Sequence, residues 1–402
     1  MENLYKKIAA KIGTPVFVYE EAVLLGNVER IRKSASDNNL QNRIKVFPSY
    51  FCNSNPNLFK VLLPKIDGIL IQTTEEYFQL KEFGIDKNLM LSPSPLSNDE
   101  IDFWVSKEVK INLSSFEEVD YFSSKYPNLP INFRLDLTSS SDQRTAIKKY
   151  QLGEVARLLR ERNIFINSLH TYPGTNSTLR ELMSYQKKAI KVYKKYFPTA
   201  KEINLGGGFS FDYTGTDRAK KHFQWDKYFS NLSYLLGKYG VSSELKLIFE
   251  PGRDIFADAG KFIISAKRIV NQGRLVNVST DGSYVYMPSA KLKKRTHQVS
   301  FYDNQFTELV EKKNRSVISG STTLSSDYVV PGIIMAPDLK AGDFIVIHDI
   351  GAYGATEHLE FLNKKPCPEV LIRTSREIEL ITNRGDDTDR IRLMLKTPRF
   401  II

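Results

Sequence analysis

Short apolar runs recur through the first 260 residues, and stretches with helical periodicity separate them. Eight of these runs have strand character: Ile44 to Tyr50, Asp67 to Ile71, Asn88 to Leu91, Val109 to Leu113, Ile131 to Leu135, Ile164 to Leu169, Glu202 to Leu205 and Leu245 to Glu250. Between them, apolar residues recur three or four positions apart, as at Trp225, Phe229, Leu232 and Leu236. This alternation predicts an α/β fold built on a (β/α)8 TIM barrel, with an open doubly wound sheet as the alternative.

The pattern changes on both sides of this repeat. The run Pro15 to Tyr19 precedes a helix-like stretch, and after about Lys261 strand-like runs follow one another without clear helices. These runs are Phe262 to Val270, Leu275 to Thr280, Ser316 to Ser319, Phe344 to His348 and Val370 to Ile372. A chain of 402 residues is longer than one core usually grows. We therefore predict three parts: an N-terminal segment 1–25 that packs with the β domain through its strand, a barrel 26–260, and a mostly β domain 261–402.

The chain is basic, with a formal net charge of +11, but its lysines are spread out. The only local cluster is Lys291, Lys293, Lys294 and Arg295. Because no nucleic-acid motif accompanies it, we interpret this cluster as a solvated loop or a partner surface, and we expect no nucleic-acid partner.

The two cysteines, Cys52 and Cys367, are too few for a disulfide framework and fit a reducing compartment. The N-terminus lacks the apolar core of a signal peptide, and the longest apolar run is too short to cross a bilayer. We therefore expect a cytoplasmic protein without a membrane partner. Five scattered histidines without HxH or HExxH spacing give no support for a metal site.

Chemical groups gather where the last two predicted barrel strands end, which is where barrels of this type hold phosphate. The seventh strand runs into Gly206-Gly207-Gly208, whose backbone N–H groups can approach an anion closely. The eighth ends in Glu250-Pro251-Gly252-Arg253, which supplies a carboxylate and a guanidinium. Taken separately, these motifs are a tight turn and a salt bridge. Together, on adjacent strands, they predict a phosphate site.

Two further turns carry candidate binding residues. After the sixth strand, Tyr172 can lie flat against an aromatic ligand and Thr175 can donate to phosphate, while His170 is interpreted as a structural hydrogen-bonding residue. In the second domain, Tyr353 stands on a glycine-flanked turn after a buried strand, where the alternative is a simple surface turn.

Four segments resemble blocks of the ornithine/diaminopimelate decarboxylase family of fold type III. The first is FPSYFCNSNP, and INLGGGF, IFEPGRDIFADAG and HDIGAYGAT follow it in the family's order, so that the likeness spans nearly the whole chain. The resemblance implies an alanine-racemase-type barrel that binds pyridoxal phosphate, and a two-fold dimer in which the β domain of one subunit completes the site of the other.

By the same resemblance, Gly206, Gly207 and Gly208 cradle the phosphate and Glu250 contacts the pyridine nitrogen. Arg253, with Gly252 beside it, supports the phosphate region. Tyr353 reaches the phosphate of a neighbouring subunit, and Tyr172 takes the place of a ring-stacking histidine.

The departures from the family pattern fall on the chemistry. Phe51 stands at the position of the lysine that holds the cofactor as a Schiff base. Thr323 takes the position of a cysteine, and Leu324 that of a carboxylate that recognises a distal amine. No catalytic residue can therefore be assigned. Strand lysines such as Lys45 lie too far from the rim, whereas loop lysines such as Lys148 stay open as replacements.

These observations favour a decarboxylase-like protein that keeps a noncovalent pyridoxal phosphate pocket without ordinary catalysis, as a degenerate or regulatory homologue. The alternative is an active decarboxylase or related lyase of amino-acid metabolism that uses noncovalent cofactor or a displaced lysine. A third hypothesis gives the pocket to another phosphorylated small molecule. The expected assembly is a homodimer, or a heterodimer with a lysine-bearing relative.

Overall fold

The structure is a computed structural model that describes residues 2–137, 145–215, 221–292 and 295–386. These residues form two compact units, and we describe each by itself. The barrel unit comprises Leu24–Asp212 and Asp217–Ile255. The β unit comprises Met1–Val23, Tyr213–Thr216 and Phe256–Ile402.

The eight predicted strands of the barrel unit are all present, although most are shorter than the apolar runs. They are β2 (Ile44–Val46), β3 (Ile69–Ile71), β4 (Leu89–Leu91), β5 (Lys110–Leu113), β6 (Ile131–Asp136), β8 (Ile166–Thr171), β9 (Glu202–Asn204) and β10 (Lys246–Phe249). They are parallel and lie in the order β2-β10-β9-β8-β6-β5-β4-β3. A short extra strand, β7 (Ile147–Lys148), pairs with β6.

The first and last strands of this order are joined by the segment that follows β2. Asp67 N donates to Val46 O across 3.0 Å, and Leu70 N donates to Pro48 O across 3.0 Å. Ser49 forms a parallel bridge with Leu70. The order follows the chain and returns to its start, which is the topology of a barrel and not of a doubly wound sheet. The barrel prediction is therefore confirmed.

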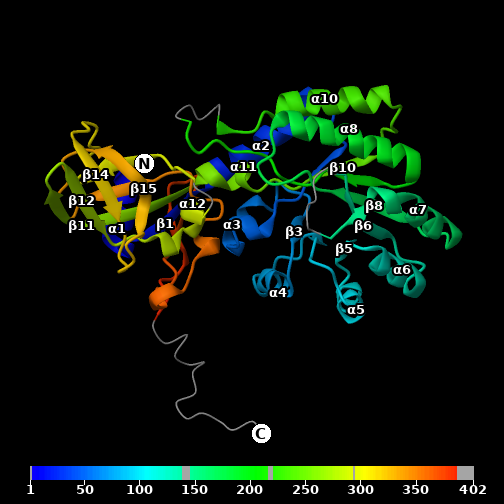
Figure 1. Cartoon of the computed structure of the whole chain (residues 1–402), viewed down its shortest axis with the longest axis horizontal. Coiled ribbons are helices and arrows are strands. Elements are labelled where there is room, and N and C mark those ends of the chain that lie inside the picture. Colours follow the sequence, from blue (N-terminus) through cyan, green and yellow to red (C-terminus); the bar gives the residue numbers. More distant parts are fainter. Residues whose placement is uncertain (1, 138–144, 216–220, 293–294, 387–402) are drawn as a thin grey trace, which may run out of the picture. The chain divides into compact units, whose positions relative to one another are not determined.

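Helices follow the strands and cover the outside of the barrel (Figure 1). They are α2 (Glu21–Asp37), α3 (Pro56–Leu62), α4 (Thr74–Glu82), α5 (Asn98–Ser106), α6 (Phe116–Lys125), α7 (Leu152–Glu161), α8 (Leu179–Tyr196), α10 (Trp225–Lys238) and α11 (Arg253–Phe256). Three of them, α5, α6 and α8, begin with a capping box in which a Ser or Thr and the Glu three residues later satisfy each other's backbone N–H. Local sequence thus fixes where these helices start.

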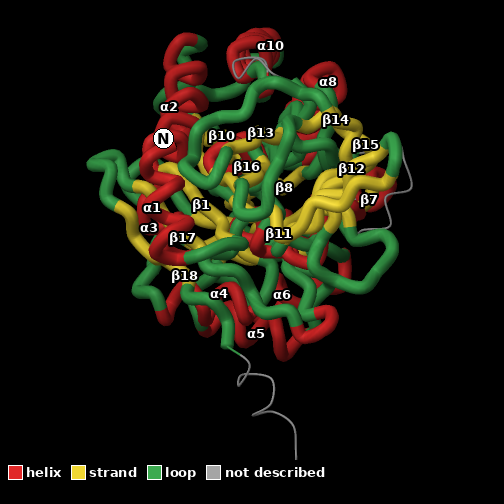
Figure 2. Tube along the Cα trace, turned by 90° about the vertical axis from the view of Figure 1, so that its left-hand side faces the viewer, coloured by secondary structure: helices red, strands yellow, loops and turns green. Residues whose placement is uncertain are grey.

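The β unit contains the second sheet, whose strands are β1 (Val16–Glu20), β11 (Gly260–Gln272), β12 (Leu275–Thr280), β13 (Val299–Tyr302), β14 (Asn314–Ser319), β15 (Tyr328–Ala336), β16 (Phe344–Ile347), β17 (Glu369–Ile372) and β18 (Ile378–Thr382). The N-terminal strand β1 lies between β11, to which it is antiparallel, and β17, to which it is parallel (Figure 2). Helix α1 (Glu2–Ile12) packs Tyr5 and Ile8 onto the apolar face of this sheet. The prediction that the N-terminal strand joins the β domain is confirmed. The limits at residues 25 and 260 stay our proposal for separately folding parts.

Candidate functional site

A buried carboxylate stands at the carboxyl end of β10. Glu250 is 4% exposed, and Asn204 Nδ2 donates to its Oε1 across 2.6 Å. His170 Nε2, equally buried, lies 3.4 Å from Glu250 Oε2. Because β8, β9 and β10 are adjacent parallel strands, their ends bring these three side chains together. His170 therefore has the structural hydrogen bond that the sequence suggested, and it makes that bond to a candidate binding residue.

Asn204 joins this carboxylate to the glycine turn. Its Oδ1 accepts a hydrogen bond from Gly206 N at 2.9 Å, and its Nδ2 also lies 3.3 Å from Met90 Sδ. The sequence reasoning missed Asn204. The available signal was an asparagine at the end of a predicted strand, two residues before the glycine turn, where an amide can satisfy backbone groups of the turn.

The glycine turn packs too closely for any side chain. Gly206 and Gly208 have φ of +69° and +89°. A Cβ on Gly206, Gly207 or Gly208 would lie 2.3 Å from Thr171 O, 2.6 Å from Glu250 O or 2.1 Å from Gly174 O. Among the hydrogen bonds of the described residues, none uses the backbone N–H of Gly207 or Gly208. A turn of this kind, with backbone donors to spare, suits an anion.

The loop after β8 touches the glycine turn. Gly174 O is the atom that a Cβ on Gly208 would meet first. Ser177 N donates a hydrogen bond to Gly208 O across 2.9 Å. In this loop the hydroxyls of Tyr172 and Thr175 lie 2.7 Å apart. The structure therefore brings the loop that carries both predicted residues against the predicted phosphate cradle.

Arg134 on β6 is a second residue that the sequence reasoning missed. It is 7% exposed, and its guanidinium carbon lies 5.7 Å from the centre of the Tyr172 ring. Its register partner on β8 is His170, and the register partner of His170 on β9 is Asn204. Arg134 thus belongs to the same polar side of the barrel interior. A lone arginine within an apolar strand was the signal for it.

Other atoms on this polar side lack partners. Asn112 Nδ2 and Oδ1, Ser168 Oγ and His170 Nδ1 are buried and have no hydrogen-bond partner in the part of the chain that the structure describes. Buried polar atoms of this kind are normally satisfied by water or by a ligand. Of these residues, His170 belongs to the strand-end group, whereas Ser168 and Asn112 lie deeper in the barrel, in the layer of Glu202.

An apolar cluster borders this polar group inside the barrel, and Phe51 lies against it. Phe47, Leu70, Met90 and Ile248 form a buried cluster, and the partly buried Phe51 packs against it. Phe51 belongs to a 3-10 turn, Tyr50–Cys52, because the strand predicted to reach Tyr50 ends at Val46. Cys52, the last residue of this turn, is buried.

Arg253 and Gly252 follow Glu250 at the start of α11. Arg253 is 8% exposed, and Gly252 O accepts from Ile255 N at 3.0 Å. The next residue, Asp254, is fully buried and bonded by Arg30 Nη2 at 2.7 Å and by Trp225 Nε1 at 2.6 Å. This ion pair between α2 and α11 fixes the turn that presents Arg253.

The remaining predicted residues lie in the β unit and are described apart from the strand ends. Tyr353 has a φ of +58°, and its carbonyl accepts from Ser289 Oγ at 2.6 Å. Leu324, which follows Thr323, is 36% exposed. The backbone N–H and hydroxyl of Thr322 both donate to Asp327. Thr323 and Leu324 therefore stand on a loop fixed by a buried carboxylate.

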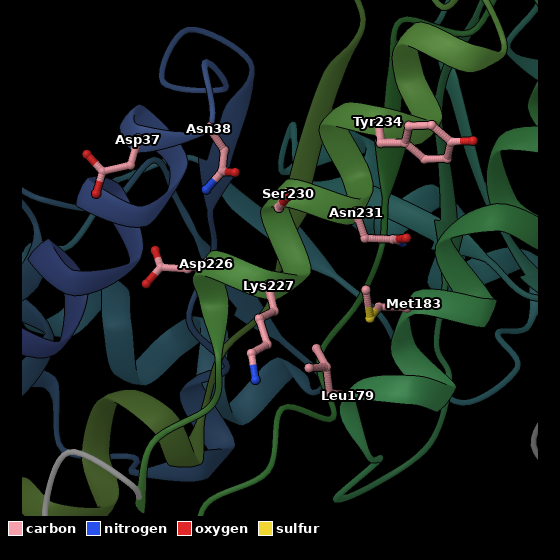
Figure 3. Close-up of a pocket in the computed structure, with 9 residues that line it drawn as sticks. All are labelled: Asp37, Asn38, Leu179, Met183, Asp226, Lys227, Ser230, Asn231 and Tyr234. Atoms are coloured by element: carbon pink, nitrogen blue, oxygen red, sulfur yellow. The ribbon is translucent and has the colours of Figure 1, made fainter.

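A groove of about 740 Å³ lies elsewhere, on the outer surface between α2, α8 and α10 (Figure 3). Its lining residues are Asp37, Asn38, Leu179, Met183, Asp226, Lys227, Ser230, Asn231 and Tyr234. None of the residues predicted from sequence lines it, so it is not our candidate site. Among the described residues, no group of three or more potential metal ligands gathers, and no described helix is long and apolar enough to cross a membrane.

Together, the barrel and its strand-end group define a class of α/β-barrel proteins that hold an anionic ligand with backbone donors and a buried carboxylate. Residues 26–257 match the family model described as the pyridoxal binding domain of pyridoxal-dependent decarboxylases. The chain therefore belongs to the fold-type III pyridoxal-phosphate-dependent decarboxylase family.

Similar proteins cover almost the whole chain. Diaminopimelate decarboxylase of Buchnera aphidicola subsp. Acyrthosiphon pisum is 22% identical over 400 residues, which are 94% of this chain and 93% of the relative. That of Streptomyces coelicolor is 23% identical and covers 94% and 88%. Among solved structures, the diaminopimelate decarboxylase of M. jannaschii in complex with L-lysine has a TM-score of 0.85 at 19% identity and covers 98% of this chain and 95% of that one. The lysine/ornithine decarboxylase of Vibrio vulnificus complexed with putrescine has a TM-score of 0.78 at 16% identity, covering 94% and 98%.

Pyridoxal phosphate is the cofactor that the family implies, and the strand-end residues fit it. The cradle has no room for a Cβ and keeps backbone donors for a phosphate. The buried Glu250 carboxylate suits a protonated ring nitrogen, and Tyr172 offers an aromatic face. From the family resemblance we expect a lysine to hold the cofactor at the position of Phe51, and phenylalanine offers no amine for that covalent bond.

Proposed function

We propose that this chain is a decarboxylase-like protein that binds pyridoxal phosphate noncovalently and lacks the ordinary catalysis of its family. One contrast carries the proposal: the anion cradle, Glu250 and their supports are intact, while Phe51 packs on an apolar cluster at the position of the cofactor-holding lysine.

Each residue of the strand-end group has a role in this proposal. The N–H groups of Gly207 and Gly208, with Arg253 and Thr175, bind the phosphate. Glu250, oriented by Asn204, binds the ring nitrogen, and Tyr172 covers a ring face. When bound, the cofactor supplies an electron-withdrawing ring that can stabilise negative charge on an attached amino acid. Phe51 neither attaches the cofactor nor moves a proton, so entry and release of an amino acid lose nucleophilic catalysis.

Two lysines were considered as replacements for the missing lysine: Lys45, which sequence placed too far from the barrel rim, and Lys148, which it left open. Both are engaged in ion pairs. Lys45 pairs with Glu202 at the amino end of β9, which is the far end of the barrel from the cradle. Lys148 lies beside the carboxyl end of β6, where its Nζ is 2.6 Å from Asp136 Oδ2. Each of these amines is engaged by a carboxylate of another strand and is not left free to condense with an aldehyde. This observation favours noncovalent binding over a displaced lysine.

The test is a spectrum followed by mass measurement. The purified chain is titrated with pyridoxal phosphate between about 300 and 500 nm, then treated with borohydride and weighed intact. We expect a bound chromophore that dialyses away and an unchanged chain mass. A mass increase by one reduced cofactor, mapped to Lys148 or another lysine, would replace this proposal by an active enzyme with a displaced lysine. Absence of binding would favour another phosphorylated ligand.

The family resemblance also supports an assembly proposal. We propose a two-fold homodimer in which the turns that carry Thr323 and Tyr353 complete the neighbour's pocket. Light scattering of the purified chain should give twice the mass of one chain, 46.0 kDa. A monomer that becomes a dimer only when a lysine-bearing relative is added would indicate a heterodimer instead.

A further inference from the structure

The basic run 291–295 contains one residue whose side chain is held in an unusual place. Arg295 lies between two aromatic rings of the β unit, with its guanidinium carbon 5.2 Å from the Tyr213 ring centre and 5.4 Å from that of Tyr353. Lys293 and Lys294 lie outside the described residues. Aromatic rings bind the faces of a guanidinium and leave the N–H groups at its edge for other partners.

One of these edge groups has nothing to bind. Arg295 Nη1 is buried and has no hydrogen-bond partner among the residues that the structure describes. Apart from its two ring contacts, no hydrogen bond or ion pair of Arg295 occurs within that part of the chain. A buried charged donor without a partner costs more than a neutral one, so the acceptor is normally supplied by water or by a ligand.

The two rings are fixed by contacts of their own. The Tyr213 ring meets the His297 ring edge-on at 5.0 Å, and Gln298 Nε2 donates to Thr214 O across 2.8 Å. The Tyr353 backbone is held in a left-handed conformation by the bond from Ser289. Backbone strain of this kind persists where the surrounding structure enforces it, often at binding sites. The guanidinium is therefore positioned before any ligand arrives.

We propose that Arg295 binds an oxyanion of a small ligand, a phosphate or a carboxylate, and that Tyr213 and Tyr353 hold its guanidinium plane for this purpose. The planar fork of arginine matches both oxyanions, and a buried N–H supplies the charge-assisted bond. Every residue in this argument lies in the β unit, so the inference does not depend on the proposed function of the barrel unit. It gives part of the basic cluster a specific role.

The experiment compares Arg295→Gln and Arg295→Lys with Arg268→Gln, a matched change of an exposed arginine on β11. Calorimetric titration of the whole chain uses inorganic phosphate, glutarate and pyridoxal phosphate as probes. We expect Arg295→Gln to weaken the binding of at least one probe by about tenfold or more. Arg295→Lys should keep only part of that affinity, because lysine lacks the planar fork. Arg268→Gln should bind all three probes as the wild type does. Unchanged binding of all three probes by a folded Arg295→Gln variant would overturn the proposal.

Two further measurements show whether the oxyanion belongs to the ligand of the cradle or to a separate one, and test the proposal even if a variant does not fold. The first repeats the titrations in a Gly207→Val background, in which the cradle is blocked. If the phosphate binding that depends on Arg295 disappears, Arg295 binds the ligand of the cradle. If that binding persists, Arg295 belongs to a separate site. On the unmutated chain, phosphate or glutarate should slow phenylglyoxal modification of Arg295 several-fold without slowing that of Arg268. Equal rates with and without both anions would contradict the proposal even if Arg295→Gln does not fold.

Discussion

Asn204 donates to Glu250 across 2.6 Å and, through its other amide atom, accepts from the first glycine of the cradle. One buried side chain therefore orients the carboxylate and holds the turn that follows β9. In a barrel whose chemistry depends on strand ends, such a residue couples the turn that follows β9 to a carboxylate 46 positions after Asn204 in the sequence.

Replacing Asn204 by Ala should weaken both the fold and the ligand site. The change leaves the buried Glu250 with one fewer donor and Gly206 N without its acceptor, so we expect the free energy of unfolding to fall by about 2–4 kcal/mol. Asn128→Ala, on an exposed loop, should change it by less than about 0.5 kcal/mol. Urea unfolding of both variants checks this. Equal stability of the two would show that Asn204 is not a support of the site.

Gly207→Ala tests the close packing of the cradle. The added Cβ would meet Glu250 O at 2.6 Å, so the turn must move, and we expect pyridoxal phosphate binding to weaken by at least about tenfold. The matched control is Gly237→Ala in α10, where a Cβ meets nothing within 4 Å. That variant should bind as the wild type does and gain up to about 1 kcal/mol of stability. Loss of binding in both variants would remove the argument for the cradle.

Phe51→Lys should restore a covalent link to the cofactor. The residue lies against the apolar cluster of Phe47, Leu70, Met90 and Ile248, so we expect a loss of about 1–2 kcal/mol in stability together with a new visible absorption band. Borohydride followed by intact mass measurement should show one cofactor per chain. Phe51→Met, which keeps an apolar side chain, should show none. A folded lysine variant that binds the cofactor only noncovalently would place the family's lysine position elsewhere.

Asp254 should make stability depend on acidity. Its burial alone would raise its pKa, but the His222 hydrogen bond and the Arg30 charge outweigh burial and lower the pKa. A carboxyl whose folded pKa lies below its unfolded value of about 3.9 stabilises the fold at higher pH, and this contribution is lost as pH falls through the folded value. The wild type should therefore lose this contribution only below about pH 4.

The Asp254→Asn variant measures that contribution directly. At neutral pH it should lower the free energy of unfolding by about 3 kcal/mol, because Arg30 loses its partner, and its difference from the wild type should shrink below about pH 4. Asp37→Asn, which breaks the exposed Lys33 pair on α2, should cost less than about 0.5 kcal/mol. A difference between wild type and Asp254→Asn that does not change with pH would contradict the assignment.

The sequence predicted the barrel well because each buried strand is an apolar run bounded by helical periodicity. It was less informative about strand ends: the run Ile44 to Tyr50 has strand character, yet the regular strand ends at Val46 and Tyr50 begins the 3-10 turn that contains Phe51. In the β unit, β15 was not assigned as a strand, because Pro331 and Gly332 interrupt it and several of its side chains are exposed.

The candidate site was predicted where a motif carries it and missed where only geometry does. The glycine turn and Glu250 are visible in the sequence because their residue types are unusual at strand ends. Asn204 and Arg134 become visible only when the register places them beside Glu250 and His170. Arg295 was seen as one charge in a basic run, and its two tyrosine contacts come from segments about 60 and 80 positions away, which periodicity does not reveal.

The position of β1 has a consequence for how this polypeptide is made. Its two neighbours, β11 and β17, are synthesised more than 200 and 300 residues later, so an emerging chain carries an unpaired apolar strand for most of its time on the ribosome. The barrel segment can close during that period, whereas the second sheet must wait for its own last strands. A chain released early, before Glu369, would keep an exposed sheet edge and should be a target for chaperones and proteases.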